Sequence, residues 1–427
     1  MARFLHLADI HLGFDRYDSR DRTRDFYYAL RDVIERHAIA AQVDFVVIAG
    51  DLFEHRLVQP AILNQAQLCL QRLKEAGIPV LAIEGNHDNR PYGTQTSWLK
   101  YLSQWQLLTL LEPTVESGGE VTYRPWDTES RSGGYVDLPC GVRVLGSQWY
   151  GATAPQAIAR LATAIQALPP GPAHTVLLFH HGLEGQIARY SGALRYQDLL
   201  PLKHAGVDYL ALGHIHKAYA VEDWIFNPGS IEANNVEEGA YDRGAYLVEF
   251  TATGIHAELR QDYQQRPIVR LGYTVTSEQS EDEVIAAAIA ILEAAIQQGK
   301  LHPHTQPIVE LRLEGQVGFE RLSLDTRQLQ QQLQALSNAL IFLLRYDVED
   351  VMYNSPVADD ASRQAIEHST FLDVLTGHRD YKKRAAELAQ GLIDLKDRSL
   401  AHQDDRDLYA FVDNLLNGTA SLTADDA

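Results

Sequence analysis

The chain has 427 residues, more than a single domain usually holds, which predicts one large domain with one or two smaller ones. Hydrophobic residues make up 45% of the sequence and charged residues 22%, values that are ordinary for a globular protein and exclude a disordered or collagen-like chain. The formal net charge of −20 argues against a protein that coats nucleic acid through overall positive charge. Any contact with nucleic acid must therefore depend on a local group of basic side chains.

The first residues and the cysteine content indicate where the protein works. Apolar and polar residues alternate in MARFLHLADIHLG, a pattern that fits neither a signal peptide nor a membrane span. Cys69 and Cys140 are too few for a disulfide framework or a cysteine-based metal site, which agrees with a reducing compartment. We therefore expect a cytoplasmic protein that does not bind membranes.

Short apolar runs that end in polar clusters predict buried strands in the first part of the chain. These runs are residues 4–8, 45–49, 80–83, 176–179 and 209–212. Stretches with helical periodicity, residues 25–41 and 60–76, separate several of the runs and would cover the sheets. The alternation predicts an α/β fold for a first domain at residues 1–265. Polar residues follow the predicted strands, where the ligand sites of such sheets lie.

The pattern changes after about residue 266. The order there is strand 268–275, helix 281–298, strand 308–313, helix 325–339 and strand 341–345. This order predicts a compact βαβαβ domain over residues 266–355.

Helices without strands are expected from Ser362 onward, in a region that we place at residues 360–417. A break at residues 401–405 would separate two helices, each with an apolar face. The faces are Leu388, Leu392 and Leu395 on one helix, and Leu408, Phe411, Val412 and Leu415 on the other. Residues 418–427 are small and polar, which predicts a disordered tail.

Motifs that can supply metal ligands directly follow the predicted strands. They are Asp9-Ile10-His11, Gly50-Asp51-Leu52-Phe53, Gly85-Asn86-His87-Asp88, His180-His181 and Gly213-His214-Ile215-His216. Alternate residues of an extended segment point the same way, so Asp-x-His and His-x-His can each present two ligands together. The glycines let the backbone approach an ion closely. Each motif taken singly is more typical of a turn or a buried core residue, but the ordered set predicts a metal centre.

The mixture of carboxylate, imidazole and amide groups without thiolate favours Mn²⁺, Fe²⁺ or Zn²⁺ over a structural zinc site. Mg²⁺ alone is a poorer fit to so many histidines. Two such cations close together acidify a water, hold phosphate oxygens and offset charge on the attacking and leaving groups. An imidazole just outside the metal ligands can give a proton to the leaving oxygen. Such chemistry suits the hydrolysis of a phosphate ester, which is what the family resemblance below implies.

The ordered motifs resemble the calcineurin-like metallophosphoesterase superfamily, which carries D-x-H, G-D-x-x, G-N-H-D/E, H and G-H-x-H. Within it, the segments FLHLADIHLG, GDLFEH, IPVLAIEGNHDNR and ALGHIHKA followed by FNPGSIEA are similar to the SbcD-type family of DNA double-strand-break-repair nuclease subunits. The resemblance covers about residues 1–250. It implies a fold of two facing mixed sheets flanked by helices.

The resemblance also implies a role for each motif residue. One metal would be bound by Asp9, His11, Asp51 and His216, and the second by Asp51, Asn86, His180 and His214, with Asp51 between the two. His180 rather than His181 aligns with the single family histidine, which leaves His181 outside the ligand set. His87 would be the acid that protonates the leaving oxygen. Glu54, three residues after Asp51, would be the carboxylate that orients it, although a solvated loop acid is the alternative for Glu54.

Basic and aromatic residues near the motifs are candidates for DNA contacts, because they can hold the phosphate backbone and stack on bases. We predict Arg16, Arg20, Arg56, Arg90 and Tyr92, with Tyr17, Arg22 and Arg24 nearby. The alternative is that the arginines are helix-surface charges balanced by neighbouring acids. His55 stands where phosphoprotein phosphatases have arginine, which disfavours that activity. The site has no basic amphipathic membrane helix near it, which disfavours a lipid substrate.

The resemblance implies an Mn²⁺-dependent nuclease that trims duplex DNA from 3′ to 5′ and cleaves single strands or hairpins. Residues 266–355 would be a cap that shapes the DNA path, and residues 360–417 would dock a coiled-coil ATPase of the SbcC type. The family works as dimers, in the cytoplasm at the nucleoid. Two alternatives are left open. One is a metallophosphodiesterase for nucleotides or lipid pyrophosphates, and the other is a DNA-end-binding scaffold whose nuclease is dispensable.

Overall fold

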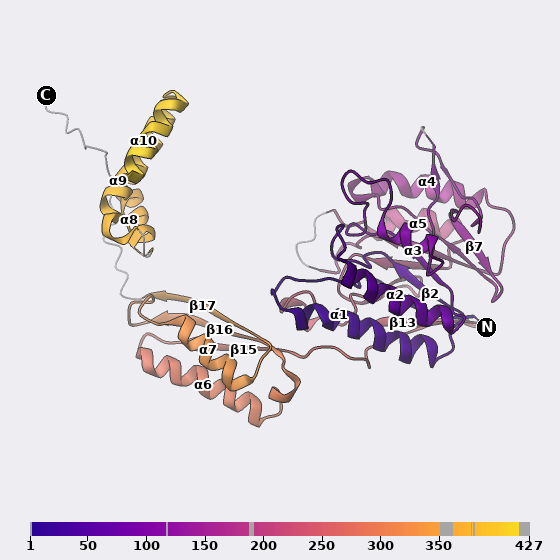
Figure 1. The fold of residues 1–427 in the computed structure, drawn as a ribbon, viewed down its shortest axis with the longest axis horizontal. Helices are drawn as coiled ribbons and strands as arrows, with labels where there is room; N and C mark the ends of the chain where they lie inside the picture. The colour runs from indigo at the N-terminus through magenta and orange to yellow at the C-terminus, as the bar shows by residue number, and fades with distance from the viewer. Residues whose placement is uncertain are drawn as a thin grey trace. The chain divides into compact units, whose positions relative to one another are not determined.

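The computed structural model describes residues 2–116, 118–187, 192–350, 362–376, 378 and 381–417 (Figure 1). The chain divides into two compact units. The first unit comprises Met1–Arg270, Lys300–Glu310 and Ser337–Ile341, and the second comprises Leu271–Gly299, Leu311–Leu336 and Phe342–Ala427. The first unit thus reaches beyond the boundary that we predict at residue 265.

Two six-stranded mixed sheets form the first unit. One has the order β14-β13-β1-β2-β3-β4, from β1 (Ala2–Leu7), β2 (Phe45–Ala49), β3 (Val80–Ile83), β4 (Thr109–Leu110), β13 (Ala245–Thr251) and β14 (Gly254–Arg260). The other has the order β11-β12-β10-β9-β8-β7, from β7 (Tyr135–Leu138), β8 (Val142–Leu145), β9 (His174–His180), β10 (Tyr209–Gly213), β11 (Tyr219–Val221) and β12 (Ile225–Asn227). Strands β1 to β4 run parallel, as do β8, β9, β10 and β12.

The two sheets face each other across a shared apolar layer. Phe4 of β1 lies 4.7 Å from the Phe45 ring of β2 and 5.2 Å from the Tyr209 ring of β10, measured between ring centroids. Leu5 and Leu7 of β1, which alternate with Phe4, pack on the opposite face of the sheet among residues of the helices. Because both faces of the sheet are buried here, β2 is apolar throughout and β1 departs from this only at Arg3 and His6, in agreement with the apolar runs in the sequence. The predicted α/β class with two facing mixed sheets is confirmed.

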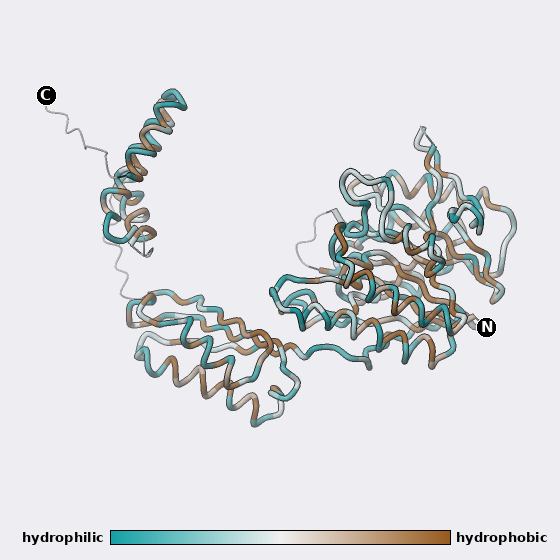
Figure 2. Tube along the Cα trace, viewed as in Figure 1, coloured by the Kyte–Doolittle hydropathy of each residue, from teal (hydrophilic) through white to brown (hydrophobic). Residues whose placement is uncertain are grey.

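Helices cover the outer face of each sheet (Figure 1). On the first sheet these are α1 (Arg20–Val33), the π-helix η1 (Ile34–Ile39), α2 (Pro60–Glu75) and α3 (Trp98–Gln104). On the second sheet they are α4 (Ala154–Gln166) and α5 (Tyr196–His204). The remaining short elements are the turns η2 (Gly151–Thr153), η3 (Glu237–Ala240) and η4 (Pro303–Thr305) and a hairpin of β5 (Thr114–Val115) and β6 (Val121–Thr122). Figure 2 shows hydrophobic residues along the strands and mixed residues along the helices.

Helix α1 begins five residues before the predicted start at residue 25. Ser19 caps it, because the Ser19 hydroxyl accepts a hydrogen bond from the backbone N–H of Arg22. The first turns are strongly charged, so hydrophobic periodicity alone does not reveal them. Helix α2 agrees with its predicted range to within one residue.

The βαβαβ order predicted after residue 266 is present. It consists of β15 (Ile268–Val275), α6 (Glu281–Gln297), β16 (Ile308–Val317), α7 (Thr326–Ser337) and β17 (Ile341–Asp350), with β16 central in the three-stranded sheet. Strands β16 and β17 extend four and five residues beyond their predicted ends at 313 and 345. The residues added to β16 are Glu314, Gly315, Gln316 and Val317, of which only Val317 is a buried apolar residue, so the apolar side chains that predict the first part of the strand do not continue through them.

The C-terminal helices are α8 (Arg363–Thr376), the turn η5 (Lys382–Arg384), α9 (Ala385–Leu400) and α10 (Asp405–Asn417). Helices α9 and α10 are separated where the sequence predicts a break. They approach closely at Gly391, where a Cβ atom would lie 2.4 Å from Leu415 Cδ1. The predicted boundaries at residues 355 and 360 and the predicted tail at residues 418–427 lie outside the described residues. Within the described parts of the chain, no helix is long and apolar enough to cross a membrane.

Candidate metal centre

The predicted ligand motifs meet at one edge of the two sheets, because each follows the carboxyl end of a parallel strand. Asp9 and His11 follow β1, Asp51 follows β2, Asn86 and His87 follow β3, His180 ends β9, and His214 and His216 follow β10. A hydrogen bond of 2.7 Å from His180 Nδ1 to the carbonyl oxygen of Ala49 joins the edges of the two sheets directly.

The backbone at this edge adopts conformations that are uncommon for residues with a Cβ atom. Asp9, His11, Asp51 and His214 have φ angles of 51°, 51°, 55° and 84°. Such strain persists where surrounding contacts enforce it, and it often marks a functional site. A Cβ atom at Gly50 would lie 2.3 Å from His180 Nδ1, and one at Gly85 would lie 2.1 Å from Asp51 Oδ1. These two motif glycines are therefore required for the ligands to approach each other.

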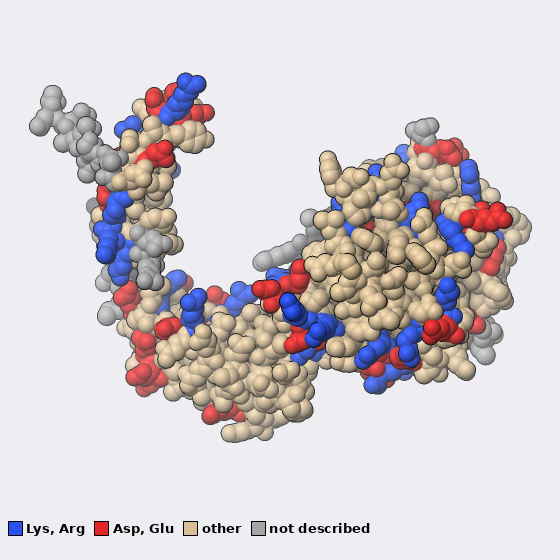
Figure 3. Space-filling model, in the orientation of Figure 1, with Lys and Arg blue, Asp and Glu red and all other residues tan. Residues whose placement is uncertain are grey.

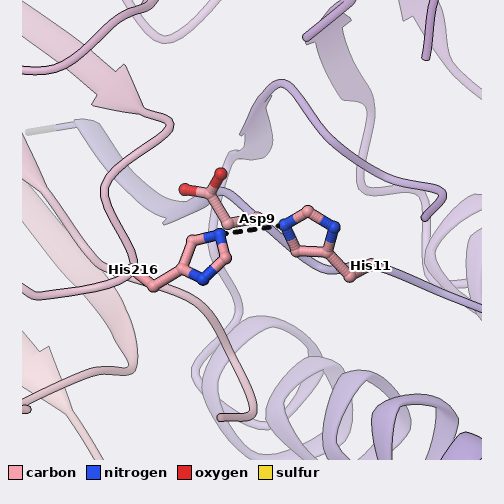
Figure 4. A group of neighbouring side chains, drawn as sticks. All are labelled: Asp9, His11 and His216. Atoms are coloured by element: carbon pink, nitrogen blue, oxygen red, sulfur yellow. Dashed lines mark hydrogen bonds between the residues drawn. The ribbon is translucent and has the colours of Figure 1, made fainter. Parts of the chain in front are cut away.

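One group of candidate ligands consists of Asp9, His11 and His216, whose ligand atoms all lie within 4.8 Å of one another. Figure 4 shows the Asp9 carboxylate beside the two imidazole rings. The Nε2 atoms of His11 and His216 face each other at 3.1 Å. A carboxylate and two converging imidazole nitrogens are a typical donor set for a divalent transition metal.

A second group consists of Asp51, His180 and His214, again with all ligand atoms within 4.8 Å. Asn86 belongs with this group, because its side-chain oxygen lies 3.1 Å from His180 Nε2 and 2.9 Å from His214 Nδ1. The two groups are adjacent, since the Asp9 carboxylate accepts a hydrogen bond of 2.9 Å from the backbone N–H of His214. The structure thus brings all the predicted ligands together. Which metal each one binds stays a prediction.

Burial and mutual contact perturb the acidity of these groups. Burial raises the pKa of Asp9, and it would raise that of Asp51, but the imidazoles of His180 and His11 hold the Asp51 pKa below its usual value. Burial lowers the pKa of His180, yet the Asp51 carboxylate outweighs it and raises the pKa to about 9. Buried carboxylates that draw protons onto neighbouring imidazoles will also draw a divalent cation. The donor set therefore fits metal ions.

His87 and Glu54 form a further group with His11, whose ligand atoms lie within 4.8 Å of one another, but the contact between His87 and Glu54 differs from the expected one. His87 Nδ1 lies 2.7 Å from the backbone carbonyl oxygen of Glu54, so Nδ1–H donates a hydrogen bond to that oxygen. Glu54 Oε2 lies 4.0 Å from His87 Nδ1 and only 2.7 Å from His11 Nδ1. The backbone of Glu54 therefore orients His87, while its carboxylate lies against the candidate ligand His11. The role of His87 as the acid stays a prediction.

Other residues support the site without joining the ligand groups. His181 contacts the backbone carbonyl oxygens of Gly182 and Gly151 and lies outside the ligand groups found among the described residues. Asp88 is buried and accepts hydrogen bonds from the backbone N–H groups of Leu52, Phe53 and Gly85, which ties two of the ligand loops together. Burial and the charge of Asp51 raise the pKa of Asp88 to about 6.

Sequence reasoning missed two residues that touch the ligands. The Trp149 ring lies 5.6 Å from that of His180 and 5.2 Å from that of His214. Glu238 accepts a hydrogen bond of 3.1 Å from His216 Nδ1. The sequence signal for Trp149 is its position shortly after the β8 strand, which runs parallel to the ligand-bearing β9 and therefore ends at the same edge of the sheet. Glu238 lies more than twenty residues after its partner, and nothing in the local sequence indicates the contact.

An open depression of about 590 Å³ lies beside the metal-ligand groups, lined by Glu54, His55, Arg56, Leu57, Asn86 and His87. Of the predicted DNA contacts, Arg16, Arg20, Arg56, Arg90 and Tyr92 are exposed, and Tyr92 is fully so. Arg22 is instead buried, where it pairs with Asp25 and Glu232. Arg24 pairs with Asp21 at 3.2 Å. On the face seen in Figure 3, basic and acidic side chains are interspersed.

The sequence was compared with known protein families. Residues 2–218 match the calcineurin-like phosphoesterase family, a range that contains all the candidate ligands. The chain belongs to this family. Its histidine and aspartate groups are typical of phosphoesterases that bind two metal ions.

Individual relatives are similar over part of their length. The chain is 30% identical over 247 residues to the DNA double-strand break repair protein Mre11 of Archaeoglobus fulgidus, covering 56% of this chain and 52% of that protein. It is 29% identical over 262 residues to the Mre11 protein of Saccharolobus solfataricus, covering 59% and 61%. An uncharacterised metallophosphoesterase of Bacillus subtilis, YhaO, is 26% identical over 275 residues, covering 60% of each chain. The matches thus span about half to three fifths of these relatives.

Proposed function

We propose that the chain is a two-metal DNA nuclease that acts in double-strand-break repair. The observation that carries the proposal is the pair of adjoining ligand groups with His87 at their side, next to an open depression. Relatives named for DNA double-strand break repair, at about 30% identity, support DNA as the substrate. An open depression admits a long chain such as a DNA strand, whereas small-molecule sites are typically more enclosed.

When bound, the two metals supply a nucleophilic water and offset the charge on the phosphate. Asp9, His11, Asp51 and His216 would hold one of them, and Asp51, Asn86, His180 and His214 the other. His87 would protonate the leaving oxygen from Nε2, because its Nδ1 is engaged by the carbonyl of Glu54. The His87 side chain is 35% exposed, so a substrate in the depression can reach it.

The exposed Arg16, Arg20, Arg56 and Arg90 would hold the DNA backbone, and Tyr92 would stack on an unpaired base. These are few contacts on a chain whose formal net charge is −20, so binding would be local and sensitive to salt. We further propose Mn²⁺ as the working metal, because the ligands mix imidazole with carboxylate and amide oxygen. The proposed activities are 3′-to-5′ trimming of duplex ends and cleavage of single strands and hairpins.

The remaining assignments concern partners. We propose that residues 266–355 cap the DNA path and that helices α8 to α10 dock a coiled-coil ATPase of the SbcC type, with the nuclease working as a dimer in the cytoplasm. Support for docking comes from large apolar side chains that these helices expose, including Ile366, Val374, Leu400, Tyr409 and Leu416. Amphipathic helices commonly dock on other helices through such side chains.

Cleavage assays on the full chain test the proposal. The purified protein is incubated with Mn²⁺ and end-labelled hairpin, single-stranded or duplex DNA, and in parallel with bis(p-nitrophenyl) phosphate. Cleavage of DNA that stops on chelation of the metal is the expected result. Turnover of the small ester alone would favour a nucleotide or lipid phosphodiesterase, and DNA retention without cleavage would favour an end-binding scaffold.

A further inference from the structure

Glu238 is a buried carboxylate next to the metal centre that the family motifs do not include. It lies in η3, after the FNPGSIEA segment, and is only 9% exposed. Its Oε1 atom lies 3.1 Å from Nδ1 of the candidate ligand His216. Exposed acids are common on this chain, but a buried acid in direct contact with a metal-binding imidazole needs a reason.

The oxygens of Glu238 are already used by protein donors. Oε1 also accepts a hydrogen bond of 2.8 Å from Asn235 Nδ2, and Oε2 accepts one of 2.8 Å from the backbone N–H of Asn234. The backbone N–H of Glu238 in turn donates to Asn235 Oδ1 at 3.0 Å. These contacts fix the carboxylate toward His216, so its geometry fits a partner of the imidazole rather than a metal ligand.

The contact selects one form of the His216 ring. A carboxylate accepts a hydrogen bond from Nδ1–H, which leaves the lone pair on Nε2. That Nε2 atom is the one that faces His11 Nε2 at 3.1 Å within the first ligand group. In the second group, by contrast, His180 Nδ1 donates to the backbone carbonyl of Ala49. A carboxylate raises the basicity of the ring more than a neutral carbonyl does.

The loop that carries Glu238 is itself anchored by buried charges. Glu232 and Arg22 are each only 1% exposed and form an ion pair of 3.3 Å between them. Arg22 also donates to the carbonyl oxygen of Ala233, and Glu232 accepts a hydrogen bond of 2.9 Å from the backbone N–H of Arg266. Helix α1 and the segment after β14 therefore hold the loop in place, which gives the Glu238 carboxylate a fixed position.

We propose that Glu238 is a positioning residue of the metal centre, which holds His216 with Nε2 directed at the cation and thereby strengthens binding of one of the two metals. The inference rests on the two-metal centre of the proposed function. Residues that orient a ligand in this way typically contribute about 10- to 100-fold to metal affinity.

Direct Mn²⁺ titration of the full chain, followed by the electron paramagnetic resonance signal of the free ion, tests the inference. We expect Glu238→Ala to weaken one of two binding events by about 10- to 100-fold and to leave the other unchanged. Glu238→Gln keeps one carbonyl acceptor for His216 and should give a smaller loss. Glu237→Gln is the matched control, because Glu237 is the adjacent acid and is exposed, and it should bind Mn²⁺ as the wild type does.

Thermal unfolding without metal separates positioning from folding. Equal Mn²⁺ affinity in Glu238→Ala and the wild type would overturn the inference, and so would a lower unfolding temperature with unchanged affinity, which assigns Glu238 to the loop alone. If the alanine variant does not fold, the glutamine variant decides the question, because it preserves the shape of the side chain. Wild-type protein that binds two Mn²⁺ ions but cleaves no DNA would overturn the proposed function and leave the inference standing.

Discussion

The sheet edge with the candidate metal ligands differs from the C-terminal helices in how far its side chains are buried and in what they contact. Asp9, Asp51 and His180 are at most 2% exposed, and other parts of the first unit contact their polar atoms. On the helices, Leu400 and Tyr409 are 67% and 74% exposed. A buried group of acids and imidazoles indicates its chemistry through its own contacts. An exposed apolar face indicates only that something covers it, so its function depends on a partner.

The largest effect expected in the metal centre comes from Asp51→Ala. This carboxylate lies in the second ligand group and accepts a hydrogen bond of 2.9 Å from the backbone N–H of His87, next to the first group. Removing it leaves two cations without the charge between them, so both metal loading and DNA cleavage should be lost. Metal analysis and the hairpin assay measure the two losses. Asp373→Ala on α8, an exposed acid, is the control, and retention of two metals in Asp51→Ala would contradict the bridging role.

His87→Ala should separate chemistry from metal binding. The ring is held through Nδ1 by a backbone carbonyl, and a general acid contributes about 10²- to 10⁴-fold to rate. We therefore expect cleavage to fall by about that factor while both metals stay bound. The same assays apply. If the metal content of His87→Ala falls as far as that of Asp51→Ala, then His87 is a ligand and not the acid.

Glu54 shows how far the sequence motifs alone determine the contacts around the metal centre. The sequence correctly predicts the strands that precede the motifs and the gathering of the candidate ligands, because each motif directly follows a parallel strand. The sequence does not predict that the backbone of Glu54, rather than its carboxylate, orients His87. Both groups belong to the same residue, so the motif is identical in either case. Contacts such as Glu238 with His216 depend on how a distant loop folds back. Similarly, Arg22 and Arg20 lie on one charged helix turn, and only packing buries Arg22.

Salt should affect cleavage by the isolated chain more weakly than these substitutions do. If four exposed arginines each contact a phosphate, counterion release predicts a loss of about 10²-fold in DNA affinity between about 50 and 200 mM salt. Cleavage at subsaturating duplex DNA, measured across that range, checks the value. Arg16→Ala combined with Arg20→Ala should flatten the dependence. Arg24→Ala is the control, because Arg24 already pairs with Asp21. Cleavage that does not respond to salt would remove the arginines from the proposed DNA contact.

Truncation of the helices should have the smallest effect on chemistry. Ending the chain at Asp360 removes α8, α9 and α10, and every candidate ligand lies at or before His216. We therefore expect unchanged Mn²⁺ binding and unchanged cleavage of single-stranded DNA at low salt, but loss of co-elution with a coiled-coil ATPase of the SbcC type. Thermal unfolding shows whether the shortened protein is folded. If it unfolds, the helices belong to the structural core and the contrast between the two regions is wrong.

Point substitutions in the full chain decide whether the apolar faces themselves bind the ATPase. Leu392 of α9 and Phe411 of α10 are only partly buried, so each can contribute to a surface as well as to the packing of the helices. Leu392→Glu combined with Phe411→Glu places two charges on those faces and should abolish co-elution with the ATPase, because a carboxylate cannot be buried in an apolar interface without a partner. Asp397→Ala combined with Asp413→Ala, at exposed positions on the same helices, should leave co-elution unchanged. Circular dichroism must show the same helix content in both double variants. If the glutamate variant is folded and still binds the ATPase as tightly as the wild type, docking involves another surface, and α8 to α10 lose the role proposed for them.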